Sequence, residues 1–231
     1  MSKKFCLLLS NTIWILGISG NVWAQSNNLD LVSIIFQGED LDAWDPPREL
    51  QNAFPYYLSG FDEECRPIWV GLLGRWDLSK FISKGESSAK AMEKFIHQAA
   101  YRFATSIKNI PSGCEPVSGV VIIYDADGFN YRQITSGETI SFVVNACKVF
   151  VPLVVQYFEN VYFVNTNFMF KGLLAIARPI MGSLMERVEV YGSHKATWVP
   201  KLLKKLPRDQ LPPTFGGNAD FKPIKTYGSY Y

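Results

Sequence analysis

The stretch VSGVVIIYDADGF, residues 117–129, decides the class of fold because its apolar part is continuous and rich in β-branched residues. A run of this kind is typical of a strand covered on both faces, as the central strands of parallel sheets are. Shorter apolar runs at 67–73, 161–164 and 188–191 are predicted to be further strands. The sequence therefore predicts a largely parallel sheet that is buried between two layers.

Apolar residues at helical spacing fill the segments between these strands. The longest such segment is 88–107, and further helices are expected at about 140–150, 168–176 and 194–206. Strands that alternate with helices predict an α/β domain in which helices flank the sheet. Ser59-Gly60, which comes before the first predicted strand, is expected to form a turn.

The composition excludes several classes of function. A net charge of +2 over 231 residues gives no strong field that would attract nucleic acid. The chain has only two histidines and four widely spaced cysteines, without a C-x-x-C pair, so no metal site and no cofactor are expected. A hydrophobic content of 48% with 19% charged residues is enough for a sizeable core.

The first 24 residues have the layout of a secretory signal peptide. Lys3-Lys4 is a short basic start, 5–23 is mostly apolar, and Val22-Trp23-Ala24 ends in a small residue. We expect cleavage near Gln25 and a secreted protein; the alternatives are a buried N-terminal helix and a cytoplasmic protein. Cleavage would leave three cysteines, which allow at most one intramolecular disulfide and leave one thiol.

The sharpest catalytic candidate is Asp125-Ala126-Asp127, directly after the central strand. A strand that ends in D-x-D resembles the first motif of haloacid-dehalogenase-type phosphatases, in which the first carboxylate attacks phosphorus. No threonine follows directly after this motif, since Gly128 stands there instead. No later lysine with an acidic pair supplies the remaining motifs of such a phosphatase. We expect these carboxylates to satisfy backbone donors in a turn, and we expect no enzyme activity.

Residues 168–185 are apolar on nearly every side of the expected helix. A segment of this kind is usually buried core. It can also bury one side against the domain and offer the other side to a ligand or a bilayer. Composition alone leaves both interpretations open.

Five groups of residues, in family order and spacing, resemble the CRAL-TRIO lipid-binding domain of Sec14-like proteins. They cover about 50–217: 55–62 with 66–70 and 74–77; 120–129; 161–165 with Phe168 and Phe170; 178–180 with 186–192; and 210–217. The resemblance implies a mixed, mostly parallel sheet that floors an apolar pocket closed by a mobile helix. That helix would run from about Phe170 to Met185.

On the same resemblance, 25–54 would be a remnant of an N-terminal helical lobe, 55–217 the lipid-binding domain and 218–231 a polar tail. The implied function is non-catalytic binding and transfer between membranes of one hydrophobic lipid: a phospholipid, or a tocopherol-, retinoid- or sterol-like molecule. The implied protein is a monomer that contacts membranes transiently and binds no nucleic acid. A scaffold that keeps the fold without binding lipid is the other alternative.

The resemblance also assigns residues to the pocket and its gate: Ile122, Tyr124, Val161, Phe163, Asn165, Phe168, Phe170, Leu173, Leu174, Ala177, Ile180 and Met181. Arg187 matches a basic position that reads a phosphoinositide headgroup in some members. The acidic Tyr-Pro-Glu sequence with the same purpose is absent, and Val155-Gln156 takes its place. Arg187 and Gln156 are therefore the headgroup candidates, and a neutral lipid is expected at least as much as a phosphoinositide.

Overall fold

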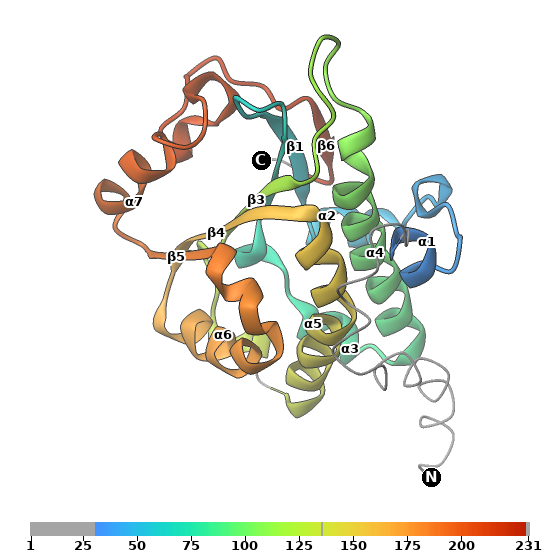
Figure 1. Cartoon of the computed structure of the whole chain (residues 1–231). Coiled ribbons are helices and arrows are strands. Elements are labelled where there is room, and N and C mark those ends of the chain that lie inside the picture. The colour runs from blue at the N-terminus through green and yellow to red at the C-terminus, as the bar shows by residue number, and fades with distance from the viewer. Residues whose placement is uncertain (1–30, 135, 230–231) are drawn as a thin grey trace. The chain divides into compact units, whose positions relative to one another are not determined.

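The computed structural model of the chain describes residues 31–134 and 136–229 (Figure 1). The signal-like segment 1–24 lies outside these residues. A six-stranded sheet has the order β5-β4-β3-β2-β1-β6. The strands are β1 (Tyr56–Phe61), β2 (Pro67–Gly71), β3 (Val120–Asp125), β4 (Phe158–Thr166), β5 (Val188–Gly192) and β6 (Lys225–Tyr227).

Strands β2, β3, β4 and β5 are parallel, and β1 runs antiparallel to both β2 and β6. The predicted mixed, mostly parallel sheet is therefore confirmed. The α-helices are α1 (Leu31–Ile35), α2 (Arg48–Ala53), α3 (Leu78–Ile82), α4 (Glu86–Thr105), α5 (Gly137–Tyr157), α6 (Phe168–Met181) and α7 (Lys195–Leu202). Short 3-10 helices connect them: η2 (Leu41–Ala43), η3 (Leu73–Arg75), η4 (Ser106–Lys108), η5 (Tyr131–Ile134), η6 (Gly182–Arg187), η7 (Arg208–Gln210) and η8 (Pro213–Phe215).

The two faces of the sheet carry separate cores. Trp69, Ile122 and Val161 point toward α4, α5 and α6, whereas their chain neighbours Ile123 and Val70 point the other way. On that other face they pack against Trp198 and Leu202 of α7 and against Leu206, Leu211 and Phe215. Since successive strand residues alternate between faces, burial on both faces explains why the run in β3 is continuous.

The turn predicted at Ser59-Gly60 is wrong, because both residues lie inside β1, which has an irregularity between Leu58 and Gly60. Gln210, 151 residues later in the chain, supports the strand there. Ser59 Oγ donates a hydrogen bond to the Gln210 carbonyl oxygen (2.6 Å), and Phe61 N donates to Gln210 Oε1 (3.2 Å). A Cβ at position 60 would lie 2.0 Å from Gln210 Oε1, so any larger residue would displace the Gln210 side chain that supports the strand.

Residues 218–231 were predicted to form a polar tail, but they contribute β6 at one edge of the sheet. The Tyr227 ring stacks on the Tyr56 ring, with centroids 4.9 Å apart. Pairing with β1 and this aromatic contact anchor the segment, which its polar composition did not reveal. Helix α5 likewise runs through Pro152 to Tyr157, beyond its predicted end near residue 150.

Candidate functional site

The floor of the candidate site is formed by β3 and β4. Ile122 pairs with Val161 in the register of these strands, and Tyr124 pairs with Phe163. All four side chains, which the resemblance assigns to the pocket, share the face that packs toward α5 and α6. The rings of Tyr124 and Phe163 are stacked with centroids 5.4 Å apart, so the floor ends in a flat aromatic surface.

Helix α6 covers this floor with one face. Phe170, Leu174 and Ala177 are buried and recur at helical spacing, and the Phe170 ring lies 5.2 Å from the Phe163 ring. Among the other predicted residues of the helix, Leu173, Ile180 and Met181 are half-buried at its borders. Phe168 is not brought together with them, because its side chain at the start of the helix is 83% exposed.

Helix α5 packs beside α6 and forms a third wall that the sequence did not assign. Leu153 is buried, and Phe142, Phe150 and Val154 are half-buried against the same core. Phe129 also belongs to the site, since its ring meets the Phe170 ring edge-on at 5.2 Å. The helical spacing of apolar residues in 140–154 was the available signal for this wall.

These two helices are unusually apolar for their degree of burial. In the most apolar 18-residue window of Gly137–Tyr157, 11% of the residues are buried, and in that of Phe168–Arg187, 22% are. By length and composition both helices could cross a membrane. Here they pack against the core on one face of the sheet, and many of their apolar residues are only half-buried or exposed.

The polar groups near this apolar region are held neutral. Burial raises the pKa of the Tyr124 hydroxyl and that of the Cys147 thiol, and burial lowers the pKa of His97. The His97 ring meets the Phe150 ring of α5 edge-on at 5.2 Å. The charged side chains of α5, α6 and η6 are all exposed: Glu138, Lys148, Lys171, Arg178, Glu186 and Arg187.

A polar cluster lies at the C-terminal ends of β3 and β4. Asn165, with a left-handed φ of 55°, donates from Nδ2 to Asp125 Oδ1 (2.8 Å), and Asp127 N donates to the same oxygen (2.9 Å). Burial is the main reason that the pKa of Asp125 is raised. The carboxylate thus satisfies backbone and amide donors in a turn. No group of three metal-ligating side chains occurs in 31–134 or 136–229.

Asn167 fixes the start of α6. Its Oδ1 accepts hydrogen bonds from the backbone N–H groups of Met169 (3.1 Å) and Phe170 (3.0 Å), which is an N-cap. Its Nδ2 donates to the carbonyl oxygen of Phe129 (2.5 Å) and so links the helix to the loop after β3. At the far end, Gly182 has φ 52° and ψ −130°, a conformation suited to glycine.

The two headgroup candidates lie near each other at the end of α5. Arg187 Nη1 donates to the carbonyl oxygens of Val155 (2.9 Å) and Phe158 (3.0 Å). Gln156, between these two residues in the chain, is exposed. The guanidinium therefore ties η6 to the junction of α5 and β4, and part of its donor capacity is already used.

A pocket of about 240 Å³ lies away from α6 and is lined by nine residues that include Asp42, Trp44, Phe95, Arg102 and Tyr227. Two of its charged groups satisfy each other: Arg102 pairs with Asp42 and also donates to the Tyr56 hydroxyl (2.7 Å). Beneath α6, by contrast, Phe170, Leu174 and Ala177 are buried against the core. The structure therefore describes α6 closed on the sheet.

Comparison with known proteins gives a consistent result. Residues 51–217 match the family model of the CRAL/TRIO domain. The chain is 20% identical over 201 residues to the SEC14 cytosolic factor of Eremothecium gossypii, a match that covers 86% of this chain and 61% of that protein. It is 21% identical over 222 residues to the phosphatidylinositol/phosphatidylcholine transfer protein SFH4 of Arabidopsis thaliana, covering 94% of this chain and 34% of that protein.

The chain spans less than two thirds of the length of these curated relatives. Among solved structures, the crystal structure of Sfh5 matches with a TM-score of 0.46 at 12% identity. That match covers 66% of this chain and 53% of the Sfh5 chain.

Proposed function

The chain belongs to the CRAL/TRIO domain family, and on this premise we propose that it binds one hydrophobic lipid and transfers it between membranes without catalysis. The proposed site lies between the floor of β3 and β4 and the helices α5 and α6. The lining would include Ile122, Tyr124, Val161, Phe163, Asn165, Phe170, Leu173, Leu174, Ala177, Ile180 and Met181. To these we add Phe129 and the inner residues of α5.

The incomplete burial of α5 and α6 is the observation that carries this proposal. Both helices are apolar enough for a bilayer, yet 11% and 22% of their most apolar windows are buried. Apolar area left in water is unfavourable in proportion to its size, so a hydrocarbon guest that covers it is stabilised. Each buried CH₂ of the guest contributes about 0.8 kcal/mol.

The charges around the site favour an uncharged lipid. Every charged side chain of α5, α6 and η6 is exposed, and Arg187 already donates to two backbone carbonyls. A phosphate placed inside would lose water without gaining a cation, which is strongly unfavourable. A lipid with a single hydroxyl or carbonyl group needs only a neutral partner, and the Tyr124 hydroxyl is one such group on the floor.

Entry of the lipid requires α6 to move, since it lies closed on the floor. Asn165, near the end of β4 and just before the helix, and Gly182, directly after it, both have positive φ, and the helix contains Pro179, which lacks a backbone N–H. We propose that α6 swings between these two points as a gate when the protein meets a membrane. Phe168 at the start of α6 and Tyr131 at the start of η5 are 83% and 65% exposed and would enter the bilayer interface beside Lys171.

Native mass spectrometry and lipidomics of the purified chain test the proposal. We expect a monomer that carries one neutral lipid. Leu174 is buried beneath α6, so Leu174→Trp would occupy volume that a lipid needs once the helix has moved away, and it should lower the lipid-bound fraction several-fold. Ile176→Trp is the matched control, because Ile176 lies on the same helix with its side chain 48% exposed, and its loading should not change.

Two results would contradict this assignment. A chain that carries no lipid after mild purification would favour the scaffold alternative. Equal loading of Leu174→Trp, Ile176→Trp and the unmodified chain would place the lipid outside the gate.

We also propose that the chain is exported after cleavage near Gln25, because it contains a disulfide in addition to the signal-like start. The curated relative from Eremothecium gossypii is described as a cytosolic factor. N-terminal sequencing of the protein from its source should find a start near Gln25. An intact Met1 would place this chain in the cytoplasm as well.

A further inference from the structure

The turn that joins β1 and β2 holds a cysteine in a conformation that favours glycine. Cys65 has a φ of 63°, which places it in the left-handed region. A side chain in this region is strained against the backbone, whereas glycine adopts it freely. Cys65 is one of three described non-glycine residues with positive φ, the others being Gln37 and Asn165.

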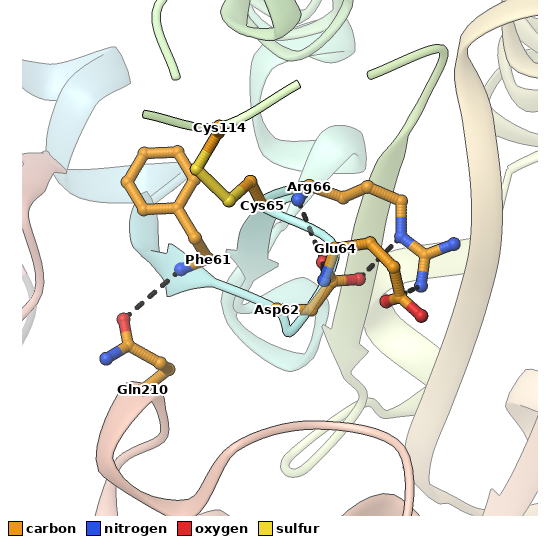
Figure 2. The surroundings of a disulfide bond; sticks show 7 residues. All are labelled: Phe61, Asp62, Glu64, Cys65, Arg66, Cys114 and Gln210. Carbon is orange, nitrogen blue, oxygen red and sulfur yellow. Dashed lines mark hydrogen bonds and ion pairs between the residues drawn. A yellow bond between two sulfur atoms is a disulfide. The ribbon is translucent and has the colours of Figure 1, made fainter. Parts of the chain in front are cut away.

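The turn is fixed by one buried carboxylate, Asp62, which is 5% exposed (Figure 2). Its Oδ1 accepts hydrogen bonds from the backbone N–H groups of Glu64 (3.1 Å) and Arg66 (2.8 Å). Its Oδ2 accepts from Arg66 Nε at 2.6 Å. Cys65 N donates to the carbonyl oxygen of Asp62 (3.0 Å), so the whole turn, including the left-handed residue, is determined locally.

Cys114 is the disulfide partner of Cys65, 49 residues further along the chain. It lies in the irregular segment 109–119 between η4 and β3, in which Pro111, Ser112, Gly113, Glu115, Pro116 and Ser118 are exposed. Such a segment has little burial to hold it in place. Because β2 and β3 are neighbouring parallel strands, the segments that precede them meet at the N-terminal ends of these strands. The disulfide joins the two segments there.

We propose that the Cys65–Cys114 disulfide is an oxidative clamp, and that the stable native form of this chain is the oxidised one. The bond restricts the unfolded chain and fixes the 109–119 segment to the β1–β2 turn. It also gives a reason for a cysteine at a position that glycine would fill with less strain. In the reduced protein the strain would remain and the gain would be lost.

Thiol–disulfide exchange forms the clamp with balanced chemistry. The thiolate of one cysteine attacks a small-molecule disulfide such as glutathione disulfide, forms a mixed disulfide and expels one thiolate. The second cysteine then attacks the sulfur of the first and expels the other thiolate. Two protein thiols are oxidised, and the donor disulfide is reduced to two thiols. Cys147 does not compete readily, because burial raises the pKa of its thiol.

The clamp is separate from the proposed lipid site. It lies at the N-terminal ends of the parallel strands β2 and β3. Helix α6, by contrast, starts after the C-terminal end of β4, on the opposite side of the sheet along the strand direction. Reduction should therefore lower stability while leaving the lipid-bound fraction of the folded protein unchanged. The clamp and the lipid-binding proposal can thus fail independently.

The first test is non-reducing peptide mapping of the full chain from its native source, followed by thermal unfolding with and without reductant. We expect a linked peptide pair containing Cys65 and Cys114, and a loss of roughly 8–15 °C in Tm on reduction. Free thiols at Cys65 and Cys114 in the isolated native protein, or an unchanged Tm, would overturn the proposal.

The second test separates the bond from the strain with a matched pair of double variants. Cys65→Gly with Cys114→Ser and Cys65→Ser with Cys114→Ser both lack the clamp and differ only at the left-handed position. Both should unfold independently of reductant, and the glycine variant should melt roughly 2–4 °C above the serine variant. Equal melting of the pair would contradict the claim that Cys65 is strained.

Discussion

The two faces of the sheet are covered in different ways. On one face, Trp198, Leu202 and Leu211 have no exposed area, so the layer formed by α7 and the C-terminal segment is closed. On the other face, α5 and α6 are more apolar, yet most of their residues are only half-buried or exposed. The sheet thus supports a buried core on each face, and the helices α5 and α6 on one of them carry apolar residues that their packing does not bury.

This difference shows that apolar content alone does not identify a core. Helix α7 carries charged and polar residues and buries its two anchors fully, as a helix with only a structural role does. Helices α5 and α6 carry more apolar residues than their packing uses. The surplus is what a ligand site requires, because the ligand completes the burial.

Removing an anchor from the closed face should have the largest effect. Trp198→Ala leaves a large cavity beside Phe215 and should lower the free energy of unfolding by about 3–5 kcal/mol. Trp198→Phe is the control, since Trp198 Nε1 is buried without a hydrogen-bond partner among the described residues and its removal leaves no donor unsatisfied. Urea unfolding of both variants measures this, and a similar loss for the two would contradict close packing around the indole.

The second largest effect is expected when a buried side chain is enlarged, and its size should differ between the two faces of the sheet. Leu202→Trp on α7 has no free space and should cost about 1–3 kcal/mol of stability, whereas Leu174→Trp on α6 should cost less because α6 can move outward. The free energies of unfolding of the lipid-free proteins give the comparison. A larger loss for Leu174→Trp would show that the space under α6 is solid core.

The exposed aromatic at the start of α6 should affect transfer and not loading. Phe168→Ser removes an apolar anchor of about 1–2 kcal/mol and should slow lipid transfer between vesicles several-fold. Ile224→Ser is the control, because Ile224 is 56% exposed next to β6, at the other end of the strand order. Equal transfer rates for both variants would remove Phe168 from the membrane contact.

The smallest effect is expected at Asp125. Burial raises the pKa of Asp125, so the folded chain binds this proton more tightly than the unfolded chain does. Its contribution to stability therefore falls as the pH rises through the raised pKa. Asp125→Asn keeps an acceptor for Asn165 and Asp127 and removes the charge, so stability at pH 7 should change by less than about 1 kcal/mol or increase slightly.

The same variant tests the phosphatase alternative. Lipid loading of Asp125→Asn should equal that of the unmodified chain, and assays with and without magnesium should show no phosphatase activity for either. A phosphatase activity that Asp125→Asn abolishes would reverse the ranking of the two functions.

The sequence predicted those parts of the fold that depend on local pattern. The unbroken run at Val120–Tyr124 predicted a central strand covered on both faces, and β3 is such a strand. The resemblance, and not spacing, assigned Phe170, Leu174 and Ala177 to the pocket, and the structure shows that they form the buried face of α6. The predicted strands and helices follow from local apolar pattern, which the chain carries within a few residues.

The remaining features depend on contacts between distant residues. Ser59-Gly60 continues a strand because Gln210 reaches it, and Tyr227 belongs to the sheet because it stacks on Tyr56. Arg187 caps backbone carbonyls near the end of α5, which its charge alone did not indicate. Phe168 is apolar but faces solvent, because its position at the first turn of α6 decides its direction.

Photo-crosslinking of a bound neutral lipid tests most directly the claim that one face of the sheet holds a guest. The full chain is loaded with a lipid that carries a photoreactive group in its hydrocarbon, irradiated and mapped by peptide mass spectrometry. The account predicts adducts within β3, β4, α5 and α6, and unlabelled peptides from α7 and residues 203–217. Adducts concentrated on α7, or spread evenly over both faces, would contradict it.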